Sequence, residues 1–419
     1  MMVVVAVGAA SMAHARELAI VNARILPAPD ALPILRGTVL VRDGRIAAMG
    51  DADGIVVPEG TAVIDGTGRT VVAGLWNSHI HLTPPPFDGP DGQPADVLSE
   101  ALSSAYLRWG FTTVFDLASA PGTGLALRAR IGSGEVVGPQ ILTADAPFFP
   151  KDGVPGYVSG DEHDSLLLKQ AEVTTPGEAI ERGERQLRQG ADGLKIFAGS
   201  IVGGEVGVLP MDIDIATAIV EVAHAAGKPV FAHPSNLEGI QVVFDSGADV
   251  LVHTTPMVGA WPEGLAARLV DRGVALVPSL KLFEIELQKE HAPPEAVESV
   301  LAAAKHQLAA FSGAGGRVLF GTDAGYIAWY DTRDELRLMQ EAGLGWRQIL
   351  ASLTTTPATL FGQGERKGRL AEGMDADLVV LGADPEHEIA ALADVLYTLR
   401  EGRIVYRADT ERQAHPPAD

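Results

Sequence analysis

The chain has 419 residues, which is enough for two or three domains or for one large barrel with additions. Hydrophobic residues make up 47% of it and charged residues 21%, a composition that excludes a disordered or fibrous protein. The net charge of -22 argues against nucleic-acid binding, because so acidic a surface repels phosphate groups.

Residues 1–15 form an apolar stretch that ends in Ala-His-Ala, a pattern that signal peptidase cleaves. The stretch is shorter than the roughly 20 residues that a membrane-spanning helix needs. No basic residue precedes Arg16, so either the true start lies upstream or this is an ordinary hydrophobic N-terminus. We predict a signal peptide and export to the periplasm or the medium, with no membrane association after processing; a cytoplasmic location is the alternative.

The two ends of the chain predict short strands separated by turns. In residues 17–73, Asp43-Gly44 lies between two apolar runs, which is a strong hairpin signal. Residues 369–408 have the same pattern, with a turn near Gly402. These β-rich ends flank a central part with a different periodicity.

The central part alternates short apolar runs with helical patterns. Eight runs predict strands, at 71–82, 111–118, 139–146, 193–198, 229–234, 250–255, 275–280 and 318–325. Between them, residues 211–226 begin with acidic side chains and stop at Gly227, as helices do. Residues 294–311 place apolar side chains at helical spacing.

Eight strands separated by helices predict an α/β fold, a (β/α)8 TIM barrel over residues 74–364. The strand–helix units average about 35 residues, which suits a barrel of about 250 residues. An open doubly wound sheet is the alternative, but no G-x-G-x-x-G follows the first strand and no P-loop occurs. Residues 83–94, rich in proline and glycine, predict a loop over the barrel mouth.

His79 and His81 lie two residues apart on the first predicted barrel strand. Side chains at i and i+2 share one face of a strand, so both imidazoles can point into the barrel and bind one ion. Alone the pair is weak evidence, because two surface histidines give the same pattern. The chain has no cysteine, so a metal would need histidine, carboxylate or modified lysine as its ligands.

Further polar residues stand at the carboxyl ends of other predicted strands: His233, His253 and Asp323. Barrel enzymes build their sites at this end of the strands. A lone histidine there is more often a hydrogen-bonded core residue. Four histidines and an aspartate converging on one rim indicate a metal site instead, because unpaired they would carry a desolvation cost of several kcal/mol.

Lys195 lies inside an apolar strand, where lysine is seldom buried without a partner. One interpretation is a lysine at an edge whose amine reaches solvent. The other is a neutral amine that reacts with carbon dioxide. The resulting carbamate is an anionic ligand with two oxygens and can bridge two metals.

The segments GLWNSHIHL, GLKIF, FAHPSN, LVHTT and GTDAG occur in this order and resemble those of the metal-dependent amidohydrolase superfamily. The similarity is greatest to its imidazolonepropionase-like and prolidase-like branch. It covers nearly the whole chain after residue 17, including the tail TTTPATLFGQGERKGRLAEGMDADLVVLGADP. The resemblance implies a TIM barrel with a small composite β-sandwich domain, formed here by residues 17–73 and 365–412.

The resemblance also implies two divalent metal ions, usually zinc. His79, His81 and Asp323 would hold one ion, and His233 and His253 the other. An N6-carboxylated Lys195 would bridge them.

The chain departs from the family in one visible place. Asn77 stands where the family often has aspartate, two residues before the first metal histidine. Because that residue is not a ligand, we expect altered hydrogen bonding around the ligands and no loss of metal.

The predicted chemistry follows from the ions. They would lower the pKa of a bridging water enough to supply hydroxide near neutral pH, and one would polarise the substrate carbonyl. Asp323 would be the catalytic residue that accepts the proton and passes it to the leaving nitrogen.

Loops at the barrel mouth predict an aromatic pocket for a small-molecule substrate. The candidate substrate-binding residues are Phe148, Phe149, Tyr157, Lys281 and Tyr326, and Phe283, Trp329 and Tyr330 lie in the same loops. Lys281 or Tyr326 could meet a carboxylate or an oxyanion, but rim packing is an equal alternative for each residue. The remaining histidines are expected to be solvated or without function: His163, His224, His291, His306, His387 and His415.

The predicted function is hydrolysis of an amide bond in a dipeptide, an N-acyl amino acid or a related carboxamide. Hydrolysis of a lactone, a cyclic amide or a phosphotriester is the alternative on the same binuclear centre. A non-catalytic assembly protein of this fold is disfavoured, because such relatives tend to lose ligands and here all six positions are filled. The sequence leaves the substrate, the native metal and the oligomeric state open, and a homo-oligomer is compatible with it.

Overall fold

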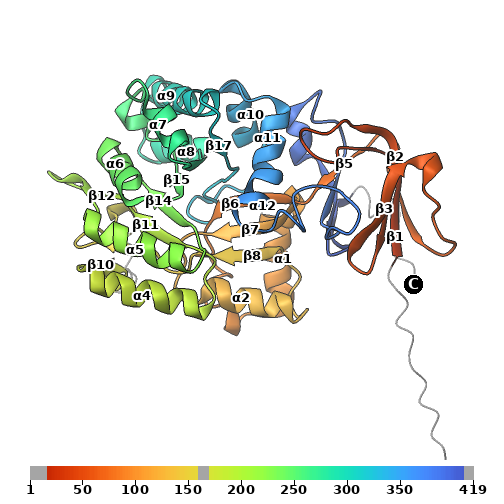
Figure 1. Ribbon diagram of the computed structural model, residues 1–419, viewed down its shortest axis with the longest axis horizontal. Coiled ribbons are helices and arrows are strands. Elements are labelled where there is room, and N and C mark those ends of the chain that lie inside the picture. The colour runs from red at the N-terminus through yellow and green to blue at the C-terminus, as the bar shows by residue number, and fades with distance from the viewer. Residues whose placement is uncertain (1–16, 159–168, 410–419) are drawn as a thin grey trace, which may run out of the picture.

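The computed structural model describes residues 17–158 and 169–409 (Figure 1). The predicted signal peptide at 1–15, His163, His415 and the last residues of the segment 365–412 lie outside the described residues. Among the helices of the described ranges, none has the length and apolar character that a membrane crossing requires.

All eight apolar runs of the central part contain a strand, and these strands form two parallel sheets. The first sheet has the order β6-β7-β8, with β6 at Leu75–Ile80, β7 at Phe111–Asp116 and β8 at Gln140–Thr143. The second has the order β11-β14-β15-β16-β17, at Leu194–Phe197, Val230–His233, Val250–Val252, Ala275–Val277 and Arg317–Val318. Within each sheet, strands that follow one another in the chain are neighbours, as repeated β–α units require.

Backbone hydrogen bonds outside the regular ladders connect the two sheets on both sides. On one side, Ser78 N donates to Phe320 O at 2.8 Å, so the chain after β17 runs beside β6. On the other side, Phe148 N donates to Lys195 O at 2.7 Å, so the chain after β8 runs beside β11. The regular strand pairing itself does not close, and an eight-stranded closed barrel therefore stays a prediction.

Helices lie between the strands in sequence and outside them in space (Figure 1). They are α1 (Ala95–Ala105), α2 (Thr123–Gly132), α4 (Pro176–Gln189), α5 (Ile213–Ala225), α6 (Leu237–Ser246), α7 (Leu265–Asp271), α8 (Leu280–Lys289), α9 (Pro294–Gly313), α10 (Arg333–Glu341), α11 (Trp346–Leu353) and α12 (Thr355–Leu360). The helices predicted at 211–226 and 294–311 are confirmed as α5 and α9. The Asp212 carboxylate caps α5 by accepting from Asp214 N and Ile215 N.

Strands from both ends of the chain share one sheet of eight strands, at the right of Figure 1. Its strands are β1 (Glu17–Ile25), β2 (Ile34–Arg42), β3 (Arg45–Asp51), β4 (Ala62–Asp65), β5 (Thr70–Ala73), β18 (Leu378–Leu381), β19 (Val395–Arg400) and β20 (Arg403–Arg407). Antiparallel pairing of β5 with β18 joins the two ends of the chain. The hairpin at Asp43-Gly44 is confirmed, with both residues at positive φ. The arrangement as a sandwich stays a prediction.

His224, for which the sequence offered no partner, has one in the structure. Its Nε2 lies 3.0 Å from Asp249 Oδ2, and the same carboxylate accepts a hydrogen bond from Val230 N at 2.8 Å. The pair joins the end of α5 to the strands it covers. The histidines at 291, 306 and 387 are exposed, as expected.

Candidate metal centre

The carboxyl ends of five strands bring the predicted ligands together. His79 lies in β6 and His81 directly follows it, Lys195 lies in β11, and His233 ends β14. His253 directly follows β15, and Asp323 lies in the segment that leaves β17, five residues after its end. Five of the six side chains are almost completely buried and His233 is half-buried. Lys195, at 1% exposure, does not reach solvent, which excludes the interpretation of an edge lysine.

Three of these residues form a tight group of ligand atoms. His81 Nε2 lies 2.7 Å from Asp323 Oδ1, and His79 Nε2 lies 3.1 Å from the same oxygen. The two Nε2 atoms are 3.1 Å apart. Because Zn–N and Zn–O bonds measure about 2.0–2.2 Å, ligands of one ion lie about 3 Å from each other. The three atoms therefore have the spacing of ligands that share one cation.

The protonation of His81 leaves its inner nitrogen available to a metal. Its Nδ1 lies 3.0 Å from Ala118 O, and since a carbonyl only accepts, Nδ1 carries the proton and Nε2 keeps its lone pair. Burial lowers the pKa of His79 well below its usual range, so its imidazole is neutral as well. The lone pair of His81 Nε2 and the Asp323 carboxylate oxygen, 2.7 Å apart, repel each other unless a proton or a cation lies between them, and a shared cation would remove that repulsion.

Two of the histidines also bury a ring nitrogen that faces away from the group of ligand atoms. Among the residues that the structure describes, His79 and His253 each bury an Nδ1 atom that has no hydrogen-bond partner. Burying a polar group without a partner is costly. The fit of these residues to a metal centre therefore rests on the spacing of the Nε2 atoms and the Asp323 carboxylate, since a cation held there would not reach the two Nδ1 atoms.

The second group of predicted ligands adjoins the first. The His253 ring lies 4.9 Å from that of His79 and 4.9 Å from that of His233, measured between centroids. Burial lowers the pKa of His233 and of His253 well below the usual range, and the charge of Lys195 lowers both further. The histidines therefore form one continuous group, with Lys195 close enough to influence their protonation.

The environment of Lys195 favours a neutral amine. Burial lowers its pKa to about 7, and the charge of Asp323 opposes this only in part. Its Nζ lies 5.5 Å from the centroid of the Phe197 ring, a mainly apolar contact. Only a neutral amine can react with carbon dioxide, so the structure provides the form of Lys195 that carboxylation requires.

Two of the predicted ligands have unusual backbone geometry. His253 has φ 75° and Asp323 has φ 60°, in the left-handed region that non-glycine residues rarely adopt. Such strain costs about 1–3 kcal/mol per residue and is typical of functional sites. Gly325 lies beside them with φ 102°, where a Cβ would come within 1.9 Å of His81 O. Only glycine fits at this point of the chain.

Asn77 holds the two ligand-bearing segments together. Its Nδ2 donates to Thr322 Oγ1 at 2.8 Å, and its Oδ1 accepts from His79 N at 3.2 Å. An aspartate at this position would lack the Nδ2 donor. The hydrogen bonds around the ligands therefore differ from those that an aspartate at position 77 could make. That metal binding is unaffected stays a prediction.

The sequence reasoning missed Asp116, the last residue of β7. It is fully buried, its two oxygens accept from Ser119 and Thr143, and His81 lies close enough to affect its protonation. Burial raises its pKa, although the hydrogen bonds act in the opposite direction. The rule that identified the other residues, a polar side chain at the carboxyl end of a strand, would have found it.

The predicted pocket residues divide into two groups. Tyr157 and Tyr326 pack edge to face with centroids 5.4 Å apart. Burial raises the pKa of both phenols, and the charges of Glu286 and Asp323 raise it further. The two tyrosines lie at the mouth of the metal centre. Phe283 is also close, with its ring 6.4 Å from that of His253.

The other predicted pocket residues are engaged with protein groups. Phe148 is fully buried under the guanidinium of Arg182, and Phe149 packs on Phe197. Tyr330 packs against Tyr106. The structure gives these three residues packing contacts with the protein, and a role in substrate binding stays a prediction.

Lys281 forms two ion pairs, at 2.9 Å with Glu284 and at 3.0 Å with Asp334. Its ammonium also lies 5.0 Å from the centroid of the Trp329 ring. A buried neighbour, Glu335 on α10, accepts from Leu280 N and Lys281 N at 2.9 and 2.8 Å and so anchors the start of α8.

Glu335 makes a pH-dependent contribution to stability. Burial raises its pKa from 4.5 to about 7, so its stabilising effect is complete below pH 4.5 and declines as pH rises toward 7. We expect the free energy of unfolding to fall by up to about 3 kcal/mol between pH 5 and pH 8 from this group. Urea unfolding at pH 5 and at pH 8 should show a smaller fall in the free energy of unfolding for Glu335→Gln than for the wild-type protein. Glu341→Gln on the same helix is the control, and an unchanged fall in Glu335→Gln would contradict the assignment.

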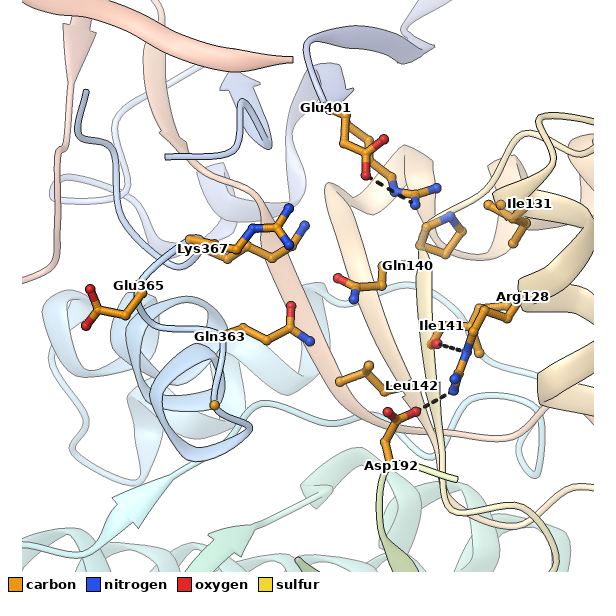
Figure 2. A pocket seen from close by; sticks show the side chains of 15 residues that line it. Arg128, Ile131, Gln140, Ile141, Leu142, Asp192, Gln363, Glu365, Lys367 and Glu401 are labelled. Atoms are coloured by element: carbon orange, nitrogen blue, oxygen red, sulfur yellow. Dashed lines mark hydrogen bonds and ion pairs between the residues drawn. The ribbon is translucent and has the colours of Figure 1, made fainter. Parts of the chain in front are cut away.

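A cavity of about 500 Å³ lies at the opposite end of the strands, where the small sheet meets the α/β part (Figure 2). Its lining includes Gln140 at the start of β8, Asp192 before β11 and Glu401 before β20. Figure 2 shows Arg128 directed to Asp192 and to Ile141 O across its wall. This cavity contains none of the predicted ligands and is distinct from the metal centre.

Comparison with known proteins identifies the family. The family model for the amidohydrolase family matches residues 70–405. Ochratoxinase of Aspergillus niger is 26% identical over 424 aligned positions, which cover 89% of this chain and 83% of that protein. Enamidase of Eubacterium barkeri is 25% identical and covers 86% of each chain.

A solved structure shows the same fold. The crystal structure of a Xaa-Pro dipeptidase with methionine in its active site superposes with a TM-score of 0.79. It is 20% identical and covers 94% of this chain and 100% of that one. An identity this low supports a common fold and by itself says nothing about the substrate.

Proposed function

The chain belongs to the amidohydrolase family, whose members similar to it hydrolyse carbon–nitrogen bonds, and on this basis we propose that it is a metal-dependent amidohydrolase. Its proposed reaction is cleavage of an amide bond in a dipeptide, an N-acyl amino acid or a related carboxamide. The observation that carries the proposal is the group formed by His79, His81 and Asp323, whose ligand atoms lie within 4.8 Å of one another.

We also propose a complete architecture for the chain, with a closed barrel and a second, smaller domain. The eight parallel strands would form a closed (β/α)8 barrel over residues 74–364, and residues 17–73 with 365–412 a composite β domain. Hydrogen bonds from Ser78 N and Phe148 N across the two gaps between the sheets support closure. The pairing of β5 with β18 supports a domain built from both chain ends.

The proposed metal centre has two ions, most simply zinc. His79, His81 and Asp323 would hold one, His233 and His253 the other, and carboxylated Lys195 would bridge them. When bound, divalent ions supply a nucleophile from water near neutral pH and polarise a carbonyl.

Groups of the protein would transfer the proton, orient the ligands and exclude water. Asp323 Oδ1 is directed into the group of histidines, where it can accept a proton from the attacking water and return it to the leaving nitrogen. Ala118 O and Asn77 fix the orientation of the ligands. The buried walls around Lys195 exclude bulk water from the site.

Metal analysis combined with a hydrolysis panel tests the proposal. We expect about two equivalents of zinc or a similar ion per chain, loss of activity on chelation, and recovery when the ion is returned. The panel should contain dipeptides, N-acyl amino acids and carboxamides beside lactones, cyclic amides and phosphotriesters. Turnover of the last three alone would favour the alternative reaction. Metal-loaded protein inactive on every member would favour the non-catalytic assembly protein.

One prediction concerns residues that the structure does not describe. Export through residues 1–15 remains a proposal, and N-terminal sequencing of the mature protein would decide it. An intact Met1 in the native host would exclude processing.

A further inference from the structure

We propose that Asp116 is a positioning residue that holds the His81 ring in the orientation and the tautomer that metal binding requires. The inference rests on the metal centre of the proposed function and deepens it, because it assigns the orientation of one ligand to a residue outside the ligand set. It follows from the hydrogen bonds at the carboxyl ends of β6, β7 and β8.

Asp116 lies on the face of the strands that is turned away from the ligands. Its neighbour Phe115 packs on Phe231 with ring centroids 4.6 Å apart, and Phe231 shares its strand face with His233. Since successive residues of a strand point to opposite faces, Asp116 is directed toward α2. There Gly124 comes so close that a Cβ on it would lie 3.0 Å from Asp116 Oδ2. Asp116 therefore affects the ligands from outside the metal centre.

Two hydroxyl groups and one backbone amide donate to the buried Asp116 carboxylate. Ser119 Oγ and Leu82 N donate to Oδ1, the amide at 3.3 Å, and Thr143 Oγ1 donates to Oδ2 at 2.8 Å. Each hydroxyl also accepts from the backbone, Ser119 Oγ from Leu82 N at 2.8 Å and Thr143 Oγ1 from Asp145 N at 2.9 Å. The hydroxyl protons are thus directed to the carboxylate, which fixes the orientation of both side chains.

The segment 116–119 contacts His81 in three places. Leu117 N donates to the carbonyl of the residue before His81 at 3.0 Å, and Ser119 Oγ accepts from the N–H of the residue after it at 2.8 Å. Between these two contacts, Ala118 O accepts from His81 Nδ1 at 3.0 Å. The hydrogen bond from Ser119 to Asp116 closes this segment and so holds the Ala118 carbonyl in place.

The Ala118 carbonyl determines which nitrogen of His81 carries the proton. A neutral imidazole without such an acceptor exchanges its proton between the two nitrogens, and the form protonated on Nε2 has no lone pair there for a metal. Partners of this kind raise metal affinity although they are not ligands themselves. Removing Asp116 is therefore expected to weaken metal binding while every ligand remains present.

Nitrogen-15 NMR of metal-free protein labelled at histidine tests the effect on the tautomer, at pH 8, where a free imidazole is neutral. His81→Gln identifies the signals of His81. We expect protonation on Nδ1 in the wild-type protein and a substantial fraction protonated on Nε2 in Asp116→Ala and in Ser119→Ala. Asp116→Asn should lie between, because its amide offers one acceptor oxygen to two hydroxyls. Ser119→Ala removes the same link if Asp116→Ala fails to fold.

Zinc affinity, measured by competition with a chelator, gives a second readout. We expect a dissociation constant at least about tenfold higher in Asp116→Ala and in Ser119→Ala. Ser99→Ala is the matched control, because Ser99 Oγ also donates, to Ala95 O at 2.6 Å, and accepts, from Val137 N at 3.0 Å. It should lower the thermal stability of the metal-free protein comparably and keep both the zinc affinity and the His81 tautomer.

The outcomes separate the positioning role from the function. An unchanged His81 tautomer in both Asp116→Ala and Ser119→Ala, or an unchanged zinc affinity in both, would overturn the inference and leave the metal centre intact. An equal loss of zinc affinity in Ser99→Ala would also overturn it, because the effect would then follow from stability alone. Wild-type protein that binds no zinc would instead remove the proposed metal centre, and the tautomer in the metal-free variants would still decide the role of Asp116.

Discussion

Replacing Asp323 with asparagine is expected to lower kcat at least about a thousandfold while the protein remains folded. The carboxylate is both a proposed ligand and the proposed proton acceptor, and general acid–base catalysis alone contributes about a hundred- to ten-thousandfold. Its Oδ1 lies 2.7 and 3.1 Å from the Nε2 atoms of His81 and His79, so no other group occupies the same position. The measurement is kcat of the variant at matched metal content.

Two controls make the Asp323 result interpretable. Circular dichroism and thermal unfolding should show that Asp323→Asn keeps the native fold, since asparagine has nearly the same shape. Asp331→Asn removes an exposed carboxylate that pairs with Arg333 and should retain activity. A metal-loaded Asp323→Asn enzyme with nearly normal kcat would refute the catalytic role.

Replacing Lys195 with methionine is expected to abolish turnover for a different reason. Without an amine no carbamate forms, the bridge between the ions is lost, and metal content should fall from about two equivalents to about one. Stability should be retained, because methionine fills a similar volume and removes a group whose burial is unfavourable, as its pKa of about 7 indicates.

Elemental analysis and carbon-13 NMR of protein equilibrated with labelled bicarbonate would measure these two effects. The wild-type protein should show a carbamate signal that Lys195→Met lacks. Lys305→Met removes a lysine paired with Glu341 on the surface and should keep both the signal and the metal. Two tightly bound ions in Lys195→Met would exclude the bridging role.

The ligand positions were predictable because a simple rule connects sequence to space. Polar residues at the carboxyl ends of parallel strands meet at one edge, so the position of His233 or Asp323 after an apolar run indicates where its side chain lies. The same holds for the hairpin at Asp43-Gly44, whose geometry depends on two adjacent residues. Asp116, the last residue of β7, follows the same rule, although it was not among the predicted site residues.

The neighbours of individual side chains were not predictable in this way. The sequence suggested that Lys281 could bind a substrate carboxylate. Only the tertiary structure shows that its ammonium already pairs with Asp334. Phe148 looked like a pocket residue, whereas its ring lies under Arg182 in the interior. His224 and Asp249 are 25 positions apart and pair only because α5 packs beside β14.

The amino-acid sequence alone therefore determined the strands and helices, the family and the residues able to hold a metal, because these depend on local spacing and on side-chain chemistry. The tertiary structure alone decided which of those atoms converge, which charges are already neutralised and which aromatic rings remain at the surface. Those properties depend on contacts between residues far apart in the chain, such as Asn77 with Thr322. No local pattern encodes such contacts, since each depends on how the intervening elements pack.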